Sequence, residues 1–203
     1  MRLHLVRHAR TEYNAAGRLQ GWCDSPLIAE GLPQLRATAA HLAGVELTGA
    51  WASPSGRTMT TAREILRHHD GLRLRADDAL REYSFGKWEA RPEPELYGRT
   101  APRAFFADVM SGAHPGLPGG ESADAFLGRV TDVFARIGRA HPEGDVLVVS
   151  HGVTLYAYLT LVGYSGAPAL ANCSVTTVEI TGTGAVVVEA GFVPPITARS
   201  AAT

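Results

Sequence analysis

Residues 3–8 read Leu-His-Leu-Val-Arg-His, a short apolar run that ends in a guanidinium and an imidazole. Such a run is typical of a buried strand, which places Arg7 and His8 at its C-terminal end. A neutral histidine can act as a nucleophile near pH 7, and an adjacent arginine is suited to hold phosphate oxygens. Taken alone, the pair is equally consistent with a phosphate site and with a polar strand end that reaches solvent.

The composition is that of a globular domain without a strong net charge. The chain has 203 residues, 45% of them hydrophobic and 19% charged, which is enough for one packed core and short for two. Nineteen basic residues against twenty acidic ones give a net charge of −1, so no basic field favours nucleic acid or a membrane surface. We therefore expect a single domain over 1–203 whose partner is a small molecule.

Cysteine use and the N-terminus bear on the compartment. The two cysteines, Cys23 and Cys173, lack CxxC spacing, so neither a disulfide framework nor a cysteine zinc site is indicated. The first residues enter a strand pattern directly, without the apolar region of a signal peptide. The sequence contains no apolar run of about eighteen residues, the length that spans a bilayer. These features predict a cytoplasmic protein.

Strand-like and helix-like patterns alternate along the chain. Apolar or alternating runs predict strands at 2–7, 50–52, 72–76 and 146–149. Apolar residues at helical spacing predict helices at 30–43, from 53–55 to about 68, at 122–140 and at 152–162. Two β-branched runs, 174–181 and 185–190, predict a hairpin. The expected fold class is α/β, a three-layer α/β/α sandwich whose mostly parallel central sheet has an antiparallel edge.

Residues 90–121 do not fit this alternation. Proline and glycine are frequent there, and a single helix-like fragment covers 95–110. We interpret the stretch as an insertion over the sheet edge that forms a lid on the active site. The end of the chain, 194–203, is small and polar, and we expect a frayed tail there.

Reactive polar residues follow three of the predicted strands. The first strand delivers Arg7 and His8, the second is followed by Arg57, and the strand at 146–149 by His151. Because ligand groups of open α/β sheets collect beyond the C-terminal strand ends, these side chains are expected on one rim. Two arginines and two histidines suit a tetrahedral anion, with one histidine attacking and the other polarising an oxygen. A zinc site is the alternative, but it would want a third ligand, and two arginines would repel the cation.

Nine segments of the chain resemble, in order, the histidine phosphatase superfamily, also called the phosphoglycerate mutase-like family. They are residues 5–14 (LVRHARTEYN), 17–22 (GRLQGW), 24–27 (DSPL), 52–58 (ASPSGRT), 61–62 (TA), 80–89 (LREYSFGKWE), 119–122 (GGES), 148–152 (VVSHG) and 172–175 (NCSV). Together they span nearly the whole chain. The resemblance implies a phosphoglycerate mutase-like fold and a phosphoryl-transfer activity.

The resemblance also implies roles for individual residues. His8 would be the nucleophile that forms a phosphohistidine. Arg7, Arg57 and His151 would bind the phosphoryl oxygens and stabilise charge in the transition state. Glu82 would protonate the leaving oxygen and then activate water. The alternative interpretation is that the Glu82 carboxylate only forms a surface ion pair with a neighbouring lysine or arginine.

Two amides complete the implied substrate site. Asn14 stands where the family places a further hydrogen-bond donor to phosphate, and Gln20 resembles the phosphatase branch more than the mutase branch. No metal and no organic cofactor is implied, and the implied substrate is a small phosphorylated metabolite.

Two positions depart from the family pattern. Ala9-Arg10 stands where the family has Gly-Glu. The alanine costs stability only if its φ is positive, and Arg10 is expected to draw a more anionic substrate. Ile28 stands in place of a threonine that would cap a helix, and this change is expected to affect stability more than chemistry.

Three functions remain open at this point. A phosphomonoesterase is preferred over a mutase because the chain is short compared with mutases of the family. A non-catalytic phosphate-binding module is the third reading. Arg91, Arg99 and Arg103 in the insertion could hold a second anionic group of the substrate, or could be ordinary surface residues. The oligomeric state cannot be read, although an exposed edge near 174–190 could pair two chains as a homodimer.

Overall fold

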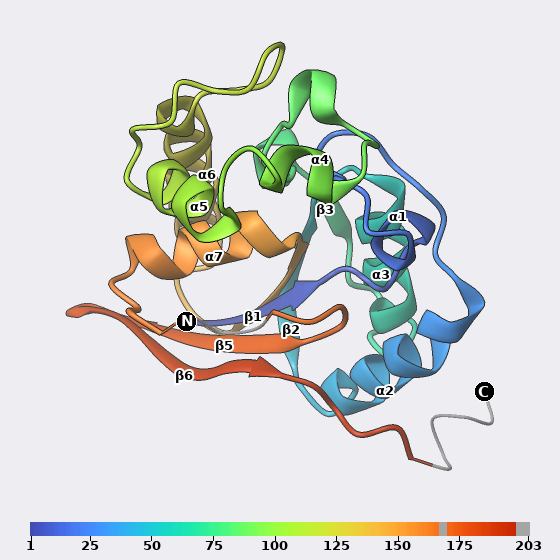
Figure 1. Ribbon diagram of the computed structural model, residues 1–203. Helices are drawn as coiled ribbons and strands as arrows, with labels where there is room; N and C mark the ends of the chain where they lie inside the picture. Colours follow the sequence, from blue (N-terminus) through green and yellow to red (C-terminus); the bar gives the residue numbers. More distant parts are fainter. Residues whose placement is uncertain (167–169, 198–203) are drawn as a thin grey trace.

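A computed structural model describes residues 1–166 and 170–197. Six strands form one sheet in the order β3-β2-β4-β1-β5-β6 (Figure 1). Their bounds are β1 (Arg2–Arg7), β2 (Leu47–Ala52), β3 (Leu74–Ala76), β4 (Asp145–Ser150), β5 (Val175–Thr181) and β6 (Gly184–Phe192). The strands from β3 to β1 pair in parallel, whereas β5 and β6 pair antiparallel. The predicted mostly parallel sheet with an antiparallel edge is confirmed.

Alternation along β1 divides its side chains between two apolar clusters. Leu3 and Leu5 belong to a cluster that includes buried residues of α6 (Ala123–Ala140) and α7 (Gly152–Leu161). Val6 belongs to a second cluster with buried residues of α2 (Leu32–Leu42) and α3 (Gly56–Leu66). Because successive side chains of a strand point to opposite faces, the helices cover both faces of the sheet (Figure 1). The three-layer arrangement is therefore confirmed.

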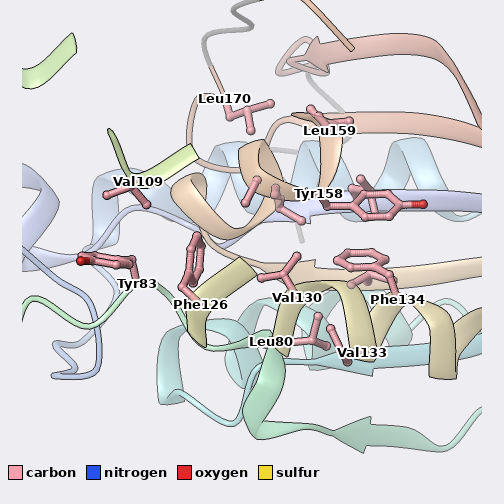
Figure 2. Close-up of a cluster of buried hydrophobic side chains, with 14 of the residues drawn as sticks. Leu80, Tyr83, Val109, Phe126, Val130, Val133, Phe134, Tyr158, Leu159 and Leu170 are labelled. Atoms are coloured by element: carbon pink, nitrogen blue, oxygen red, sulfur yellow. The ribbon is translucent and has the colours of Figure 1, made fainter. Parts of the chain in front are cut away.

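The larger cluster lies mainly between the sheet, α6 and α7. Figure 2 shows Phe126, Val130 and Phe134 along α6 beside Tyr158 of α7. The rings of Phe134 and Tyr158 stack with centroids 3.6 Å apart. Close packing of α6 against α7 matters for the site, because both helices support the segment that carries Glu82.

Residues 90–121 contain two helices where one helix-like fragment was predicted. They are α4 (Glu93–Tyr97) and α5 (Pro102–Met110), and they lie over the end of the sheet (Figure 1). The single fragment 95–110 is wrong because Pro102 starts a new helix, which leaves Ala101 extended with ψ 132°. A residue before proline is disfavoured in the helical region. The remaining short helices are α1 (Glu12–Ala15), η1 (Ala29–Gly31), η2 (Asp78–Leu80) and η3 (Gly86–Trp88).

The edge strand β6 is followed by a short described segment, residues 193–197. Val186 and Val188 of the edge strand β6 are exposed, and the expected homodimer through this edge stays a prediction. Pro194 is buried and its carbonyl accepts a hydrogen bond from Gln34, so the chain is held at the start of the expected tail. Residues 198–203 of that tail lie outside the described residues. In the part of the chain that is described, no helix is both long and apolar enough to cross a membrane.

Candidate active site

The C-terminal ends of β1, β2 and β4 lie side by side in the middle of the sheet. Backbone hydrogen bonds continue past the strands, from His8 N to Ser150 O at 3.0 Å and from Ser53 N to Val149 O at 3.0 Å. The residues that follow each strand are therefore fixed relative to one another. This places the histidines and arginines predicted from the sequence at one rim.

His8 is buried with one ring nitrogen committed to the backbone. Its Nδ1 lies 2.8 Å from Ala9 O, and because a carbonyl can only accept, Nδ1 carries the proton in the neutral ring. Nε2 is then the unprotonated nitrogen and the available nucleophile. Burial, with the charges of Arg57 and Arg7, lowers the pKa of His8 well below its usual value. The Asn172 amide donates to His8 O at 2.9 Å and holds the backbone in place.

His151 is the neighbouring imidazole, and its ring centroid lies 5.3 Å from that of His8. Arg57 donates to its Nδ1 at 3.0 Å, so Nε2 carries the proton and donates to Ser53 Oγ at 2.8 Å. Burial and the nearby positive charges, first that of Arg57, lower the pKa of His151 well below its usual value. Both histidines are therefore neutral near pH 7.

Arg57 is buried beneath the site and held by several acceptors. Nη1 donates to Cys23 O at 2.7 Å and to the Asp24 carboxylate at 2.8 Å, and Nη2 donates to Gly21 O at 2.7 Å. This set fixes the guanidinium plane next to His151. Buried guanidinium groups need such partners, because an unpaired charge in the interior is costly.

Arg7 also has a fixed guanidinium, whose Nη1 donates to Leu170 O at 2.6 Å. The Nε atoms of Arg7 and Arg57 are both buried and have no hydrogen-bond partner among the described residues. Native proteins leave few buried donors unsatisfied, and such groups call for an explanation. Two unsatisfied guanidinium N–H groups beside a neutral imidazole fit a site that receives an anion.

Glu82 is fixed at the N-terminus of α7. One carboxylate oxygen accepts from Val153 N at 2.9 Å, and the other accepts from the backbone N and the hydroxyl of Thr154, both at 2.9 Å. The first N–H groups of a helix lack partners within the helix and favour a negative charge. Arg81 pairs with Asp78 instead, so the reading of Glu82 as a surface ion pair is wrong.

The amides of Asn14 and Gln20 make different contacts. Asn14 Oδ1 accepts from Thr11 N and from Asn172 Nδ2, which leaves its amide nitrogen to donate to a ligand. Gln20 uses both ends of its amide, accepting from the Thr11 hydroxyl at 2.7 Å and donating to Ser25 Oγ at 2.9 Å. Gln20 therefore braces the loop, and one N–H remains for a substrate.

A cavity of about 580 Å³ opens at this rim. Five of the seven predicted site residues line it, namely Arg7, His8, Asn14, Gln20 and Glu82. Arg57 and His151 lie behind this wall, in contact with each other and close to His8. Their direct contact with phosphoryl oxygens stays a prediction. Within the described ranges, no group of three or more His, Cys, Asp or Glu is arranged to hold a metal ion.

Comparison with known proteins decides the family. The model of the histidine phosphatase superfamily (branch 1) matches residues 3–192. The chain belongs to the histidine phosphatase superfamily. It is 34% identical to a probable phosphoglycerate mutase, GpmB, of Enterobacter sp. (strain 638), over 88% of this chain and 85% of that protein.

Other relatives are named as phosphoglycerate mutases or as phosphatases. A putative phosphoserine phosphatase 2 of Hydrogenobacter thermophilus is 34% identical over 89% of this chain and 87% of its own length. Among solved structures, YhfR of Bacillus stearothermophilus superposes with a TM-score of 0.81 at 29% identity, covering 94% of this chain and 96% of that one. Membership therefore supports a phosphoryl-transfer enzyme.

The departures from the family pattern have simple structural outcomes. Ala9 does not adopt a positive φ, so alanine is tolerated, and it packs with Leu35 and Cys173. Arg10 is exposed and does not line the cavity, and its expected effect on the charge of the substrate stays a prediction. Ile28 precedes η1 and makes no side-chain capping bond.

Two positioning elements of the site were missed in the sequence. Arg129 of α6 donates to the carbonyls of Arg81 and Glu82 and pairs with Glu121, which in turn accepts from Ser84 N. The ion pair braces the backbone on both sides of the Glu82 side chain. The family segment at 119–122 contains Glu121 and is the signal that points to this contact. Its partner eight positions along could not be inferred from that segment.

Glu89 is the second missed element. Its carboxylate accepts four backbone N–H groups, from Gly21, Trp22, Cys23 and Phe85, at 2.9 to 3.2 Å. The same loop offers the Gly21 and Cys23 carbonyls to the Arg57 guanidinium. Glu89 therefore orients one side of the loop so that the other side can hold the arginine.

Residues 90–121, which we predict to form a lid, line the cavity with none of their three arginines. The guanidinium groups of Arg91 and Arg99 lie over the Trp88 ring, 5.4 and 5.5 Å from its centroid. Arg103 is exposed, and none of the three lines the cavity. The hypothesis that they hold a second anionic group is therefore not supported, and the reading as surface residues fits better.

Proposed function

We propose that this chain is a phosphomonoesterase that works through a phosphohistidine on His8. The observation that carries the proposal is the His8 ring, whose Nδ1 is committed to Ala9 O in a cavity also lined by Arg7 and Glu82. That arrangement leaves Nε2 to attack a phosphorus atom held by guanidinium groups. A neutral imidazole is needed for attack, and burial among positive charges keeps the pKa of His8 low.

The reaction has two balanced steps. In the first, His8 Nε2 forms a bond to phosphorus as the bond from phosphorus to the ester oxygen breaks, and the protonated Glu82 carboxyl supplies the proton that the leaving alcohol takes. In the second, Glu82 removes a proton from water, the water oxygen bonds to phosphorus, and the bond from nitrogen to phosphorus breaks. Inorganic phosphate leaves and His8 is restored.

The buried arginines contribute electrostatic stabilisation. Arg7 and Arg57 place two positive charges near His8, and the buried Nε–H group of each has no partner among the described residues. Fixed donors aimed at a site of developing negative charge lower the barrier without reorganising during the reaction. The His151 imidazole, held by Arg57 and Ser53, keeps its ring orientation as the charge on phosphorus moves.

Hydrolysis is preferred over mutase activity because of the rest of the cavity. Beyond the phosphate end, its wall is largely apolar, formed by Phe85, Tyr97, Pro102, Phe106, Val153 and Tyr156. A mutase must grip a phosphorylated sugar acid and return the phosphoryl group to another hydroxyl without losing it to water. Apart from Arg7 and His8 at the phosphate end, Arg18 is the only basic residue among the described lining residues, so the wall offers few groups for a carboxylate. Mutase activity remains the second candidate because a probable phosphoglycerate mutase is 34% identical.

The test is phosphate release from a panel of monoesters that includes 3-phosphoglycerate. We expect the protein to release free phosphate from several esters. The release should be abolished in His8→Ala and retained in His68→Ala, because His68 is exposed and lies 60 positions after His8 in the sequence. Glu82→Gln is expected to slow alkyl esters by about 10²- to 10⁴-fold. For an aryl ester with a good leaving group, Glu82→Gln should slow the first step far less than the second. An acid-labile phosphoenzyme should therefore accumulate.

The alternatives give different results in the same assay. Conversion of 3-phosphoglycerate to 2-phosphoglycerate without phosphate release would establish the mutase. Binding of orthovanadate without turnover of any ester would establish a phosphate-binding module. Phosphate release that survives His8→Ala would exclude the proposed nucleophile.

A further inference from the structure

Besides Glu82, a second carboxylate lines the cavity, that of Glu93. Glu93 is the first residue of α4 and lies at the cavity mouth. Its backbone is fixed, because Glu93 N donates to Gly17 O at 2.9 Å and Pro92 pairs with Arg18 in an isolated β-bridge. The backbone that carries Glu93 is therefore anchored to the segment that follows α1.

Glu93 forms no ion pair with any described residue. The nearby Arg91 pairs with Glu95 at 3.7 Å, and Arg18 directs a guanidinium N–H to Ala90 O at 2.7 Å. The negative charge of Glu93 thus acts on whatever occupies the cavity mouth.

The field of Glu93 reaches the groups deeper in the cavity. Burial raises the pKa of Tyr97 above its usual value, and the charges of Glu93 and Glu82 raise it further. Glu93 also acts on Arg7, where burial lowers the pKa and the charges of Glu82 and Glu93 oppose that shift. Arg18 also lines the cavity, so beside the apolar walls the lining carries the Glu93 carboxylate and the Arg18 guanidinium, and the latter is directed at Ala90 O.

We propose that Glu93 selects monoesters whose alcohol part carries no second negative charge, so that the preferred substrates have an uncharged or cationic, partly apolar leaving group. The inference rests on the proposed phosphomonoesterase activity and names the substrate class of the same site. A carboxylate on the leaving group would meet Glu93 on entering the apolar part of the cavity. An uncharged alcohol of the same size would not.

The expected effect is modest because Glu93 is exposed. Two like charges about 8 Å apart in a partly solvated site change kcat/KM by roughly 5-fold. Salt screens exposed charges within about 8 Å at physiological ionic strength. The discrimination should therefore shrink as salt is added, which an effect of shape alone would not do.

The experiment compares two esters of nearly equal size, glycerol 3-phosphate and 3-phosphoglycerate, which differ in a hydroxymethyl group against a carboxylate. The measured quantity is the ratio of their kcat/KM values. We expect Glu93→Gln to shift this ratio toward 3-phosphoglycerate by about 3- to 10-fold, with little change for glycerol 3-phosphate. Glu95→Gln, on the same helix but outside the cavity wall, is the matched control and should leave the ratio unchanged.

Other outcomes overturn the inference in identifiable ways. An unchanged ratio in Glu93→Gln, or the same shift in Glu95→Gln, would remove Glu93 as the selecting group. A selective loss of 3-phosphoglycerate turnover in Arg18→Met would show instead that Arg18 accepts a second anion. Failure of the proposed function looks different, because neither ester would then release phosphate in the unsubstituted protein.

Discussion

Replacing Glu89 by glutamine tests how the loop that holds Arg57 is stabilised. The Glu89 carboxylate accepts four backbone N–H groups, two on each oxygen. Glutamine keeps one acceptor oxygen and replaces the other with an NH₂ group, which can only donate. Two N–H groups, those of Gly21 and Cys23 if the amide oxygen takes the Oε1 position, would then face another donor.

The magnitude follows from these four bonds. Each buried donor left without an acceptor costs about 1–3 kcal/mol, and bonds to a charged acceptor are stronger than bonds to a neutral amide. Glu89 and Cys23 are only partly buried, so water can reach part of the loop and recover part of this loss. We therefore expect Glu89→Gln to lower the free energy of unfolding by about 2–4 kcal/mol. For a chain of this size that corresponds to a fall in Tm of roughly 5–15 °C.

The assay is urea unfolding followed by far-UV circular dichroism, with phosphate release measured on the same preparations. Glu95→Gln is the control, because Glu95 makes one exposed i,i+4 ion pair at 3.7 Å and such pairs contribute about 0.5 kcal/mol or less. Activity should fall together with stability in Glu89→Gln, since the same loop carries the acceptors for Arg57. A loss below about 1 kcal/mol, no larger than that of the control, would refute the assignment of Glu89 as the organising acceptor.

Two further predictions concern the histidines and the brace behind Glu82. The pKa of His8 and of His151 is lowered by folding, so below about pH 6.5 the unfolded chain binds protons that the folded chain does not, and stability falls as pH drops. In His8→Gln the slope of unfolding free energy between pH 6 and 5 should be shallower by up to about 1.4 kcal/mol per pH unit, and an unchanged slope would contradict the lowered pKa. Arg129→Met should reduce kcat more than it changes KM and lower stability by about 3 kcal/mol, because it leaves the part-buried Glu121 without its partner. A rise in KM at constant kcat would argue against a role in positioning Glu82.

The rim of the candidate site could be predicted because its residues follow strands that are obvious in the sequence. The apolar run of β1 and the continuous apolar run of β4 end in Arg7-His8 and in Ser150-His151, and parallel pairing brings such ends together. Glu82 could be predicted only from the family resemblance, because no local pattern in the sequence indicates that this carboxylate lies at a helix N-terminus. The prediction of the sheet and of the rim thus depends on strong apolar patterns in the sequence.

The supporting contacts could not be predicted, because they join segments that carry no mutual signal. Nothing in residues 21–23 indicates that four backbone N–H groups converge on Glu89, 66 positions after Cys23. The arginines of residues 90–121 show the same limit. The guanidinium groups of Arg91 and Arg99 lie over the Trp88 ring, and this position depends on the path of the chain around two short helices.

These contacts explain why positive charge can be buried at the rim before any anion arrives. Arg57 is stabilised by the Gly21 and Cys23 carbonyls and by a half-exposed Asp24 carboxylate, rather than by a fully buried counter-ion. Carbonyl dipoles hold the guanidinium without neutralising its charge, whereas a buried counter-ion would cancel that charge. The buried Glu82 carboxylate lines the same cavity, but its oxygens are bound by backbone N–H groups at the start of α7. Arg7 and Arg57 therefore keep their positive charge near His8, where we propose that phosphorus is attacked.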